Sequence, residues 1–513
     1  MMTTQPLLAP SAIDALRDVL TSHGYTREGI VARVGIEAAQ GLNRYDPTLA
    51  LQLLGEGDPL AVLIQLFMCG RTVRLRSVEP GVVPLLETAG EGLVRAAVYL
   101  HPYEKWWALS DFPRFLRPDP QDRRADGVQP IGPDATLLRR ATLTHRVESA
   151  LDLGTGGGVQ ALHLSGQAAR VTATDLSPRA VRFAATTAAL NGLDWEVLHG
   201  DMAQPVAGRR FDLVVSNPPF AVGPGTVHCV HRDSGRPGDG LCAELAGNAP
   251  ELLTEGGYLQ FRAHWLHRAG EDWRERVADW IPGGAGLDAW IVQRSAAGVV
   301  PYVDQWLELG GGEEALGQRE AWLRWFEGQK AEAVGMGTVV VRRSGRERSA
   351  VRVEELSAEA GELTGAQVAG WFARQDWLRA HDPLAERLTP GHGLTLWQQA
   401  DHRDGAGWQL AQQVLKVPGD GLNWSERVSP LAVALLGGAG RDATIGEQVA
   451  RLAEAEGTEP GRLAEAALPE VARLVERGAL VPTAPDATGP GGPDAVRPGG
   501  PDAARLSAPD ALG

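Results

Sequence analysis

The chain has 513 residues, 43% of them hydrophobic, and a formal net charge of −15 at pH 7. This length predicts about three domains with ample apolar core. The longest apolar stretch, residues 60–68, is far shorter than the roughly 20 residues of a membrane-spanning helix, which excludes an integral membrane protein. The chain is acidic, and its sequence shows no clear basic face of the kind that usually marks a nucleic-acid-binding protein.

The first residues and the cysteines indicate the compartment. Met1–Gln5 place no basic segment before an apolar core, so no secretory signal is visible. Cys69, Cys229 and Cys242 are scattered and make no disulfide framework. We therefore predict a cytoplasmic protein.

Residues 1–95 are predicted to form a small, mainly helical module. Segments 12–20, 26–34 and 59–68 have helical periodicity, and a glycine-interrupted stretch follows at 78–98. This pattern is typical of a winged-helix-like fold, and such a module would favour contact with nucleic acid.

Residues 96–130 are predicted to be a connector. It carries an aromatic patch that consists of Tyr99, Tyr103, Trp106, Trp107 and Phe112. Such a patch either receives a substrate or packs one domain onto the next, and the second use is the commoner.

From residue 131 to 344 the pattern changes to alternating strands and helices. This alternation predicts an α/β fold with a doubly wound, Rossmann-like parallel sheet. Seven strands are expected, at residues 150–153, 171–174, 195–198, 211–216, 257–261, 289–293 and 338–341. A helical insertion at 299–331 separates the last two strands.

The remainder of the chain is predicted to be an α+β region and a tail. Residues 345–482 form the region, and its helical end, from 445, again resembles a winged-helix-like unit. Residues 483–513 repeat Pro-Asp-Ala and are rich in glycine and proline. Such a composition cannot bury enough apolar surface to order itself, so a disordered tail is expected.

The first strand of the α/β region runs into a glycine-rich loop at residues 151–159, Leu-Asp-Leu-Gly-Thr-Gly-Gly-Gly-Val. Glycines at a strand-to-helix turn allow close approach of the backbone to a ligand. A dinucleotide fingerprint would place its third glycine one residue after Gly158. The loop instead resembles the first motif of class I S-adenosylmethionine-dependent methyltransferases, in which Asp152 would meet the methionine ammonium group.

The same resemblance implies roles for residues after the next two strands. Asp175 ends the second strand, where a carboxylate accepts from the ribose hydroxyls, and Asp201 follows the third, where it would accept from the adenine amine. The implied cofactor, S-adenosyl-L-methionine, would be bound by Asp152, Gly154, Thr155, Gly156, Gly158, Asp175, Leu176, Asp201, Met202 and Asn217.

The fourth strand, residues 211–216, ends in Asn217-Pro218-Pro219-Phe220. The prolines fix φ and remove two donors, so that backbone carbonyls are free to accept, while Asn217 adds a side-chain oxygen and Phe220 a stacking face. This catalytic tetrapeptide resembles the motif of methyltransferases that act on planar nitrogen, and the implied chemistry is displacement at the sulfonium methyl without a metal.

The substrate is predicted less narrowly than the reaction. The loop Gly238–Leu241 is similar to that of release-factor glutamine N5-methyltransferases, whereas Phe220 is frequent in ribosomal-RNA guanine N2 enzymes. The acidic charge slightly favours a protein glutamine. The alternatives are an rRNA or DNA base, methylated at guanine N2 or adenine N6, and a non-catalytic nucleic-acid-binding protein with a methyltransferase-like core. The expected partner is accordingly a release-factor-like protein or ribosomal RNA.

Overall fold

The computed structural model describes residues 4–55, 57–119, 124–307, 313–357, 359–405, 407–419, 421–440 and 442–483. The chain divides into two compact units, which are described separately. The first comprises residues 1–377 and 392–428, and the second 378–391 and 429–513. Apart from Thr483, the predicted tail lies outside the described residues.

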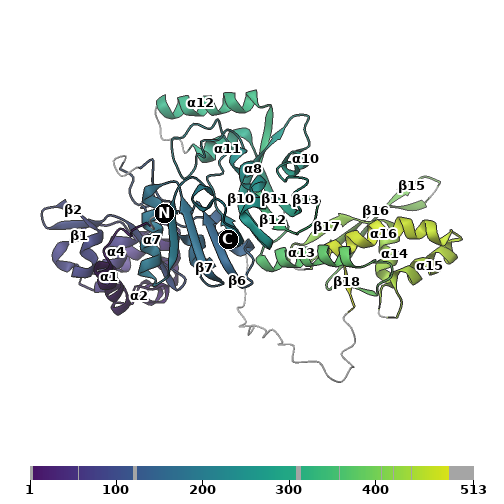
Figure 1. Cartoon of the computed structure of the whole chain (residues 1–513), viewed down its shortest axis with the longest axis horizontal. Coiled ribbons are helices and arrows are strands. Elements are labelled where there is room, and N and C mark those ends of the chain that lie inside the picture. Colours follow the sequence, from purple (N-terminus) through teal and green to yellow (C-terminus); the bar gives the residue numbers. More distant parts are fainter. Residues whose placement is uncertain are drawn as a thin grey trace, which may run out of the picture. The chain divides into compact units, whose positions relative to one another are not determined.

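An eight-stranded sheet forms the centre of the first unit, in the order β13-β11-β12-β10-β9-β6-β7-β8 (Figure 1). Its strands are β6 (Val147–Leu153), β7 (Ala168–Asp175), β8 (Trp195–His199), β9 (Phe211–Ser216), β10 (Leu253–Arg268), β11 (Leu287–Gly298), β12 (Ala331–Arg343) and β13 (Ala350–Glu355). Strands β6 to β10 pair in parallel, and β12 runs antiparallel to both of its neighbours. The predicted α/β class and all seven expected strands are confirmed.

The count of seven strands was wrong by one. Strand β13 pairs in parallel with β11 at the edge of the sheet and lies beyond the expected domain end at residue 344. Its sequence carries Arg352, Glu354 and Glu355. A half-polar edge strand lacks the continuous apolar run that marks the buried strands, so the apolar pattern does not reveal it.

The strand order reverses beside β6. The chain proceeds outward from β6 to β7 and β8, then returns to the other side of β6 as β9. The carboxyl ends of β6 and β9 therefore flank a topological switch point, which is where open α/β sheets bind ligands.

The helices that accompany the sheet are α5 (Pro133–Ala141), α6 (Val159–Leu164), α7 (Pro178–Leu190), α8 (Gly240–Gly247), α9 (Ala249–Leu252) and α10 (Trp273–Ala278). Local sequence explains the start of α7. Ser177 caps it by accepting from the amide of Ala180 at 3.2 Å, and Pro178 occupies the first turn, where a missing N–H costs nothing. The helix buries Phe183 and several alanines.

The N-terminal residues form α1 (Pro10–Ser22), α2 (Arg27–Asn43), α3 (Thr48–Leu53), α4 (Pro59–Phe67), the sheet β1 (Val73–Arg74), β3 (Leu93–Ala96) and β2 (Leu86–Gly90), and the hairpin β4 (Tyr99–Tyr103) and β5 (Trp106–Ser110). In Figure 1 these purple helices lie beside α7. Arg17 joins them by donating to the carbonyls of Leu190 and Ala189, at 2.9 and 2.6 Å. Tyr99 of the aromatic patch is fully buried, so it packs rather than receiving a substrate.

The segment between β11 and β12 carries helices α11 (Val299–Trp306) and α12 (Glu313–Gly328). Beyond β13 follow α13 (Gly365–Ala380) and the sheet β15 (Thr395–Arg403), β16 (Gly407–Val417) and β17 (Trp424–Arg427).

The second unit contains α14 (Pro430–Gly438), α15 (Ile445–Glu456) and α16 (Pro460–Arg477), with β14 (Leu388–Pro390) paired to β18 (Leu480–Pro482). A capping box between Thr444 and Glu447 begins α15. Within the part of the chain that the structure describes, no helix is long and apolar enough to cross a membrane.

Candidate active site

A cavity of about 970 Å³ opens at the switch point. This volume is at the upper end of the range for small-molecule sites, roughly 300–1,000 Å³. The predicted residues that line it are Gly154, Thr155, Gly156, Asp175, Leu176, Asp201, Met202, Asn217, Pro218, Pro219 and Phe220. The structure thus brings the three expected cofactor segments and the tetrapeptide together in one surface.

The glycine loop is shaped to leave space. Gly154 and Gly156 adopt φ values of 70° and 56°, in the left-handed region that side chains rarely occupy. A Cβ on Gly154 would stand 4.0 Å from the Cα of Pro218, so the loop and the tetrapeptide lie side by side. A ligand at Gly154 would therefore also reach the tetrapeptide.

Gly158, expected in the cofactor site, does not line the cavity. Its φ is 91°, and a Cβ there would approach Cζ3 of Trp195 to 2.6 Å. A side chain at this position has no room against the β8 indole. The third glycine therefore serves close helix–sheet packing, as glycines at strand-to-helix turns often do.

Asp152 lies beneath the loop, 1% exposed, rather than in the lining. Its Oδ2 accepts from the hydroxyl of Thr155 at 2.7 Å and from the amide of Ala161 at 3.0 Å, which fixes the turn. Its Oδ1 is buried and has no hydrogen-bond partner among the described residues. Burial, and to a lesser degree the nearby charge of Asp175, raise the pKa of Asp152 to about 7.

Asp175 is held at the end of β7 by two backbone amides. Its Oδ2 accepts from Gly156 and its Oδ1 from Ser177, each at 2.8 Å. Burial raises the pKa of Asp175, and the two amide bonds oppose that shift. Both oxygens keep further lone pairs for a diol. Beside them Leu176 is 53% exposed within the lining and offers an apolar surface.

Asp201 and Met202 form the adjoining wall. Asp201 accepts through Oδ2 from Arg236 at 3.0 Å, so an expected ligand of the adenine amine is already linked to the loop that follows the tetrapeptide. Met202 has φ 45°, unusual for a residue with a side chain, and its carbonyl accepts from Thr174 at 2.9 Å. This bond contributes to holding the strained turn.

The tetrapeptide presents a free side-chain acceptor. Asn217 Oδ1 is buried and has no hydrogen-bond partner among the described residues. Phe220, 7% exposed, packs on His264 with ring centroids 4.4 Å apart and meets Trp306 edge-on at 5.8 Å. A buried, unsatisfied amide oxygen costs about 1–3 kcal/mol, which a ligand donor would recover.

Sequence reasoning missed the other half of the lining. Residues 111–119 and 124–135 pass over the glycine loop, and the amide of Val230 donates to the carbonyl of Ala125 at 3.0 Å. Asp111 anchors this segment by accepting from Arg179 Nε at 2.9 Å and from the amide of Val128 at 2.8 Å. No short motif marks such a segment, because its partners are distant in the sequence.

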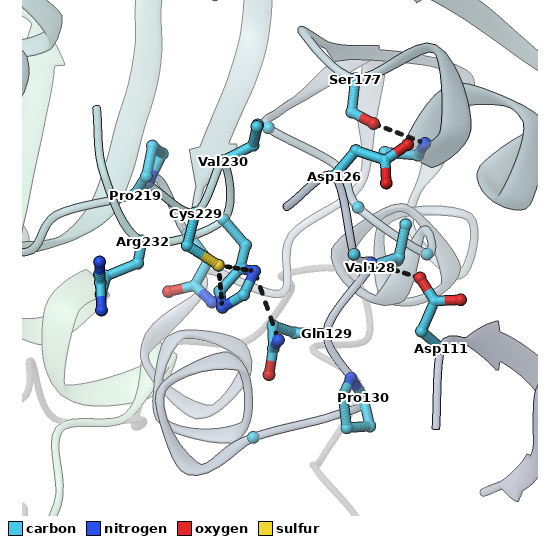
Figure 2. Close-up of a pocket in the computed structure, with 18 of the residues that line it drawn as sticks. Asp111, Asp126, Val128, Gln129, Pro130, Ser177, Pro219, Cys229, Val230 and Arg232 are labelled. Carbon is cyan, nitrogen blue, oxygen red and sulfur yellow. Dashed lines mark hydrogen bonds between the residues drawn. The ribbon is translucent and has the colours of Figure 1, made fainter. Parts of the chain in front are cut away.

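A polar group lies where this segment meets the loop after the tetrapeptide. Cys229 and Gln129, both labelled in Figure 2, each contact the ring of His231. The thiol sulfur is 3.1 Å from Nδ1, and the Gln129 amide nitrogen is 3.3 Å from the same atom. Burial raises the pKa of Cys229 and lowers that of His231, which favours the neutral form of both. Across the described chain, no group of three or more His, Cys, Asp or Glu could hold a metal.

The loop Gly238–Leu241 contributes little to the lining. Asp239 is 7% exposed, pairs with Arg276 and accepts from the amide of Leu266 at 3.0 Å. Its carboxylate fixes α8 against β10, and Leu241 alone of this loop reaches the cavity.

Three segments of the chain match known protein families. Residues 133–264 match the family described as "Methyltransferase small domain". Two families described as domains of unknown function match residues 22–98 and 369–482. The predicted resemblance to methyltransferases is therefore confirmed for residues 133–264.

The names of individual relatives refer to two kinds of substrate. The chain is 37% identical over 172 residues to "Release factor glutamine methyltransferase" of Xylella fastidiosa, covering 26% of this chain and 62% of that protein. It is 36% identical over 120 residues to "Ribosomal RNA small subunit methyltransferase C" of Salmonella choleraesuis, covering 23% and 34%. A solved T. thermophilus 16S rRNA N2 G1207 methyltransferase is 17% identical, with TM-score 0.25 and coverage of 47% and 56%. The chain thus spans less than two thirds of these relatives.

Proposed function

We propose that the protein is an S-adenosylmethionine-dependent N-methyltransferase that modifies a planar amide or amino nitrogen of a macromolecule. The observation that carries the proposal is the unpaired Oδ1 of Asn217, which is buried beside the glycine loop. An acceptor NH₂ is the group that would satisfy it.

The cofactor fits the groups present. S-adenosylmethionine supplies an electrophilic methyl group when bound. Asp175 would accept from the ribose diol, Leu176 and Met202 would cover the adenine, and the free lone pairs of Asp201 would take its amine. Asp152 fixes the turn from beneath the loop, and the glycine loop leaves room for the chain of the cofactor.

The protein's own contribution is positioning and polarisation. Asn217 Oδ1 and the Pro218 carbonyl would accept from the NH₂ group, which holds the nitrogen lone pair toward the methyl donor. Phe220 would stack on the plane of the acceptor. Asn217 Oδ1 is itself shielded from solvent, and the displaced proton would leave to solvent after transfer.

A protein glutamine is favoured over a base because of the charges around the cavity. Four of the arginines that line it are paired with carboxylates at short range: Arg124 with Asp126, Arg179 with Asp111, Arg232 with Asp233, and Arg236 with Asp201 and Glu244. A phosphate backbone would have to compete for these cations. A neutral peptide amide would not.

The test is methyl transfer by the full-length protein. Tritiated S-adenosylmethionine is incubated with total protein and, separately, with ribosomal RNA, each from a strain that lacks the gene. We expect label in a protein band the size of a release factor and none with Asn217→Ala. Label confined to ribosomal RNA would replace the glutamine by a base, and no label in either fraction would support the non-catalytic alternative.

A further inference from the structure

The inserted helix α11 reaches the back of the tetrapeptide. The amide of Val222, two residues beyond Phe220, donates to the hydroxyl of Tyr302 at 2.9 Å. The same hydroxyl is 2.9 Å from Nδ1 of His264, on β10. The hydroxyl accepts from Val222, and in the tautomer of His264 that carries its proton on Nε2 it donates to Nδ1.

The chain of contacts from Val222 through Tyr302 to His264 is buried. Tyr302 is 0% and His264 3% exposed, and the Val222 side chain lies in the same buried cluster as Tyr302. Burial lowers the pKa of His264 to about 3 and raises that of Tyr302. Both side chains are therefore neutral at ordinary pH, and the arrangement of donors does not change with pH.

This chain of contacts continues from His264 to the ring of Phe220. His264 packs on Phe220 with ring centroids 4.4 Å apart, at 47°. Trp306, one turn of α11 beyond Tyr302, meets Phe220 at 87° and lines the cavity. One inserted helix thus contacts both the backbone after the tetrapeptide and the ring of Phe220.

We propose that Tyr302, acting through Val222 and His264, is a positioning residue that sets the orientation of the Asn217–Phe220 loop, and that Trp306 forms the edge of the acceptor pocket. This inference rests on the proposed function, which gives the Asn217–Phe220 loop the role of binding the acceptor. The insertion between β11 and β12 is accordingly part of the catalytic unit. Tyr302 would influence turnover without contacting either substrate.

The first test needs no substrate. Hydrogen–deuterium exchange of the full-length protein is followed in the peptide from Asn217 to Gly225, where the prolines leave few amides besides Val222. Tyr302→Phe removes only the hydroxyl, so we expect the Val222 amide to exchange at least tenfold faster. The matched control is Val303→Ala, which shortens a fully buried side chain of the same helix and breaks no hydrogen bond. Unchanged exchange in Tyr302→Phe would overturn the inference.

The second test measures the effect on reaction, with whichever fraction the wild type labels. Tyr302→Phe should lower kcat about 10-fold to 100-fold while the Kd for S-adenosylmethionine stays within twofold, whereas Val303→Ala should retain kcat. Wild-type kcat in Tyr302→Phe would refute a positioning role even if exchange is faster. If the wild type labels nothing, the proposed function fails, and the exchange experiment still decides whether Tyr302 holds the loop.

Discussion

The two halves of the cavity are built differently. The cofactor half consists of strand ends and one turn within residues 152–202, and backbone amides hold its carboxylate Asp175. The acceptor half is assembled from residues 111–119 and 124–135, the loop after the tetrapeptide, and α11. Under the proposed function, short local motifs would thus specify binding of the cofactor, while tertiary contacts would specify the acceptor.

The difference explains what could be predicted from the sequence. The glycine loop, Asp175, Asp201 and the tetrapeptide are short motifs at strand ends, and the parallel sheet forces strand ends to meet. Asp152 and Gly158 belong to the same motif, but their burial depends on Trp195 and on helix α6. The contacts of Asp111 with Arg179 and of Tyr302 with Val222 join distant segments, so no local sequence pattern predicts them.

The largest effect is expected in the acceptor half. Asn217→Ala removes the unpaired side-chain oxygen of the tetrapeptide, and we expect turnover to fall by about 100-fold or more, by analogy with loss of one polarising hydrogen bond. The Kd for S-adenosylmethionine should stay within about twofold. Asn248→Ala, an asparagine outside the cavity lining, is the control. Wild-type turnover in Asn217→Ala would remove the polarising role.

In the cofactor half we expect the opposite result, a loss of cofactor affinity with little change in turnover. Asp175→Ala should weaken binding of S-adenosylmethionine by roughly 30-fold, because the variant loses hydrogen bonds between charged and neutral groups. At saturating cofactor, kcat should fall no more than about threefold. Glu196→Ala breaks a half-exposed ion pair with Arg209 outside the cavity lining and should leave binding unchanged. Equal losses in Kd and kcat would mean that the halves are not separable.

A smaller effect concerns stability and pH. Since the folded state raises the pKa of Asp152 from 3.8 to about 7, it holds the proton more tightly than the unfolded state does. The resulting stabilisation is present below about pH 4 and is lost as pH rises through 7. Asp152→Asn preserves an acceptor for Thr155 and Ala161 and cannot ionise.

We therefore expect the Tm of Asp152→Asn, relative to wild type, to rise by a few degrees between pH 5 and pH 8. Differential scanning calorimetry without cofactor measures this difference. A constant offset across that range would show that Asp152 does not titrate there. A loss of S-adenosylmethionine affinity in the variant at pH 8 would support contact with the methionine ammonium.

Titration calorimetry of S-adenosylmethionine into the full-length wild type, Asn217→Ala and Asp175→Ala tests the central claim most directly. The account predicts one site per chain, equal affinity in wild type and Asn217→Ala, and clearly weaker binding in Asp175→Ala. No heat of binding by the wild type at millimolar cofactor would contradict the assignment of the cavity to a methyl donor.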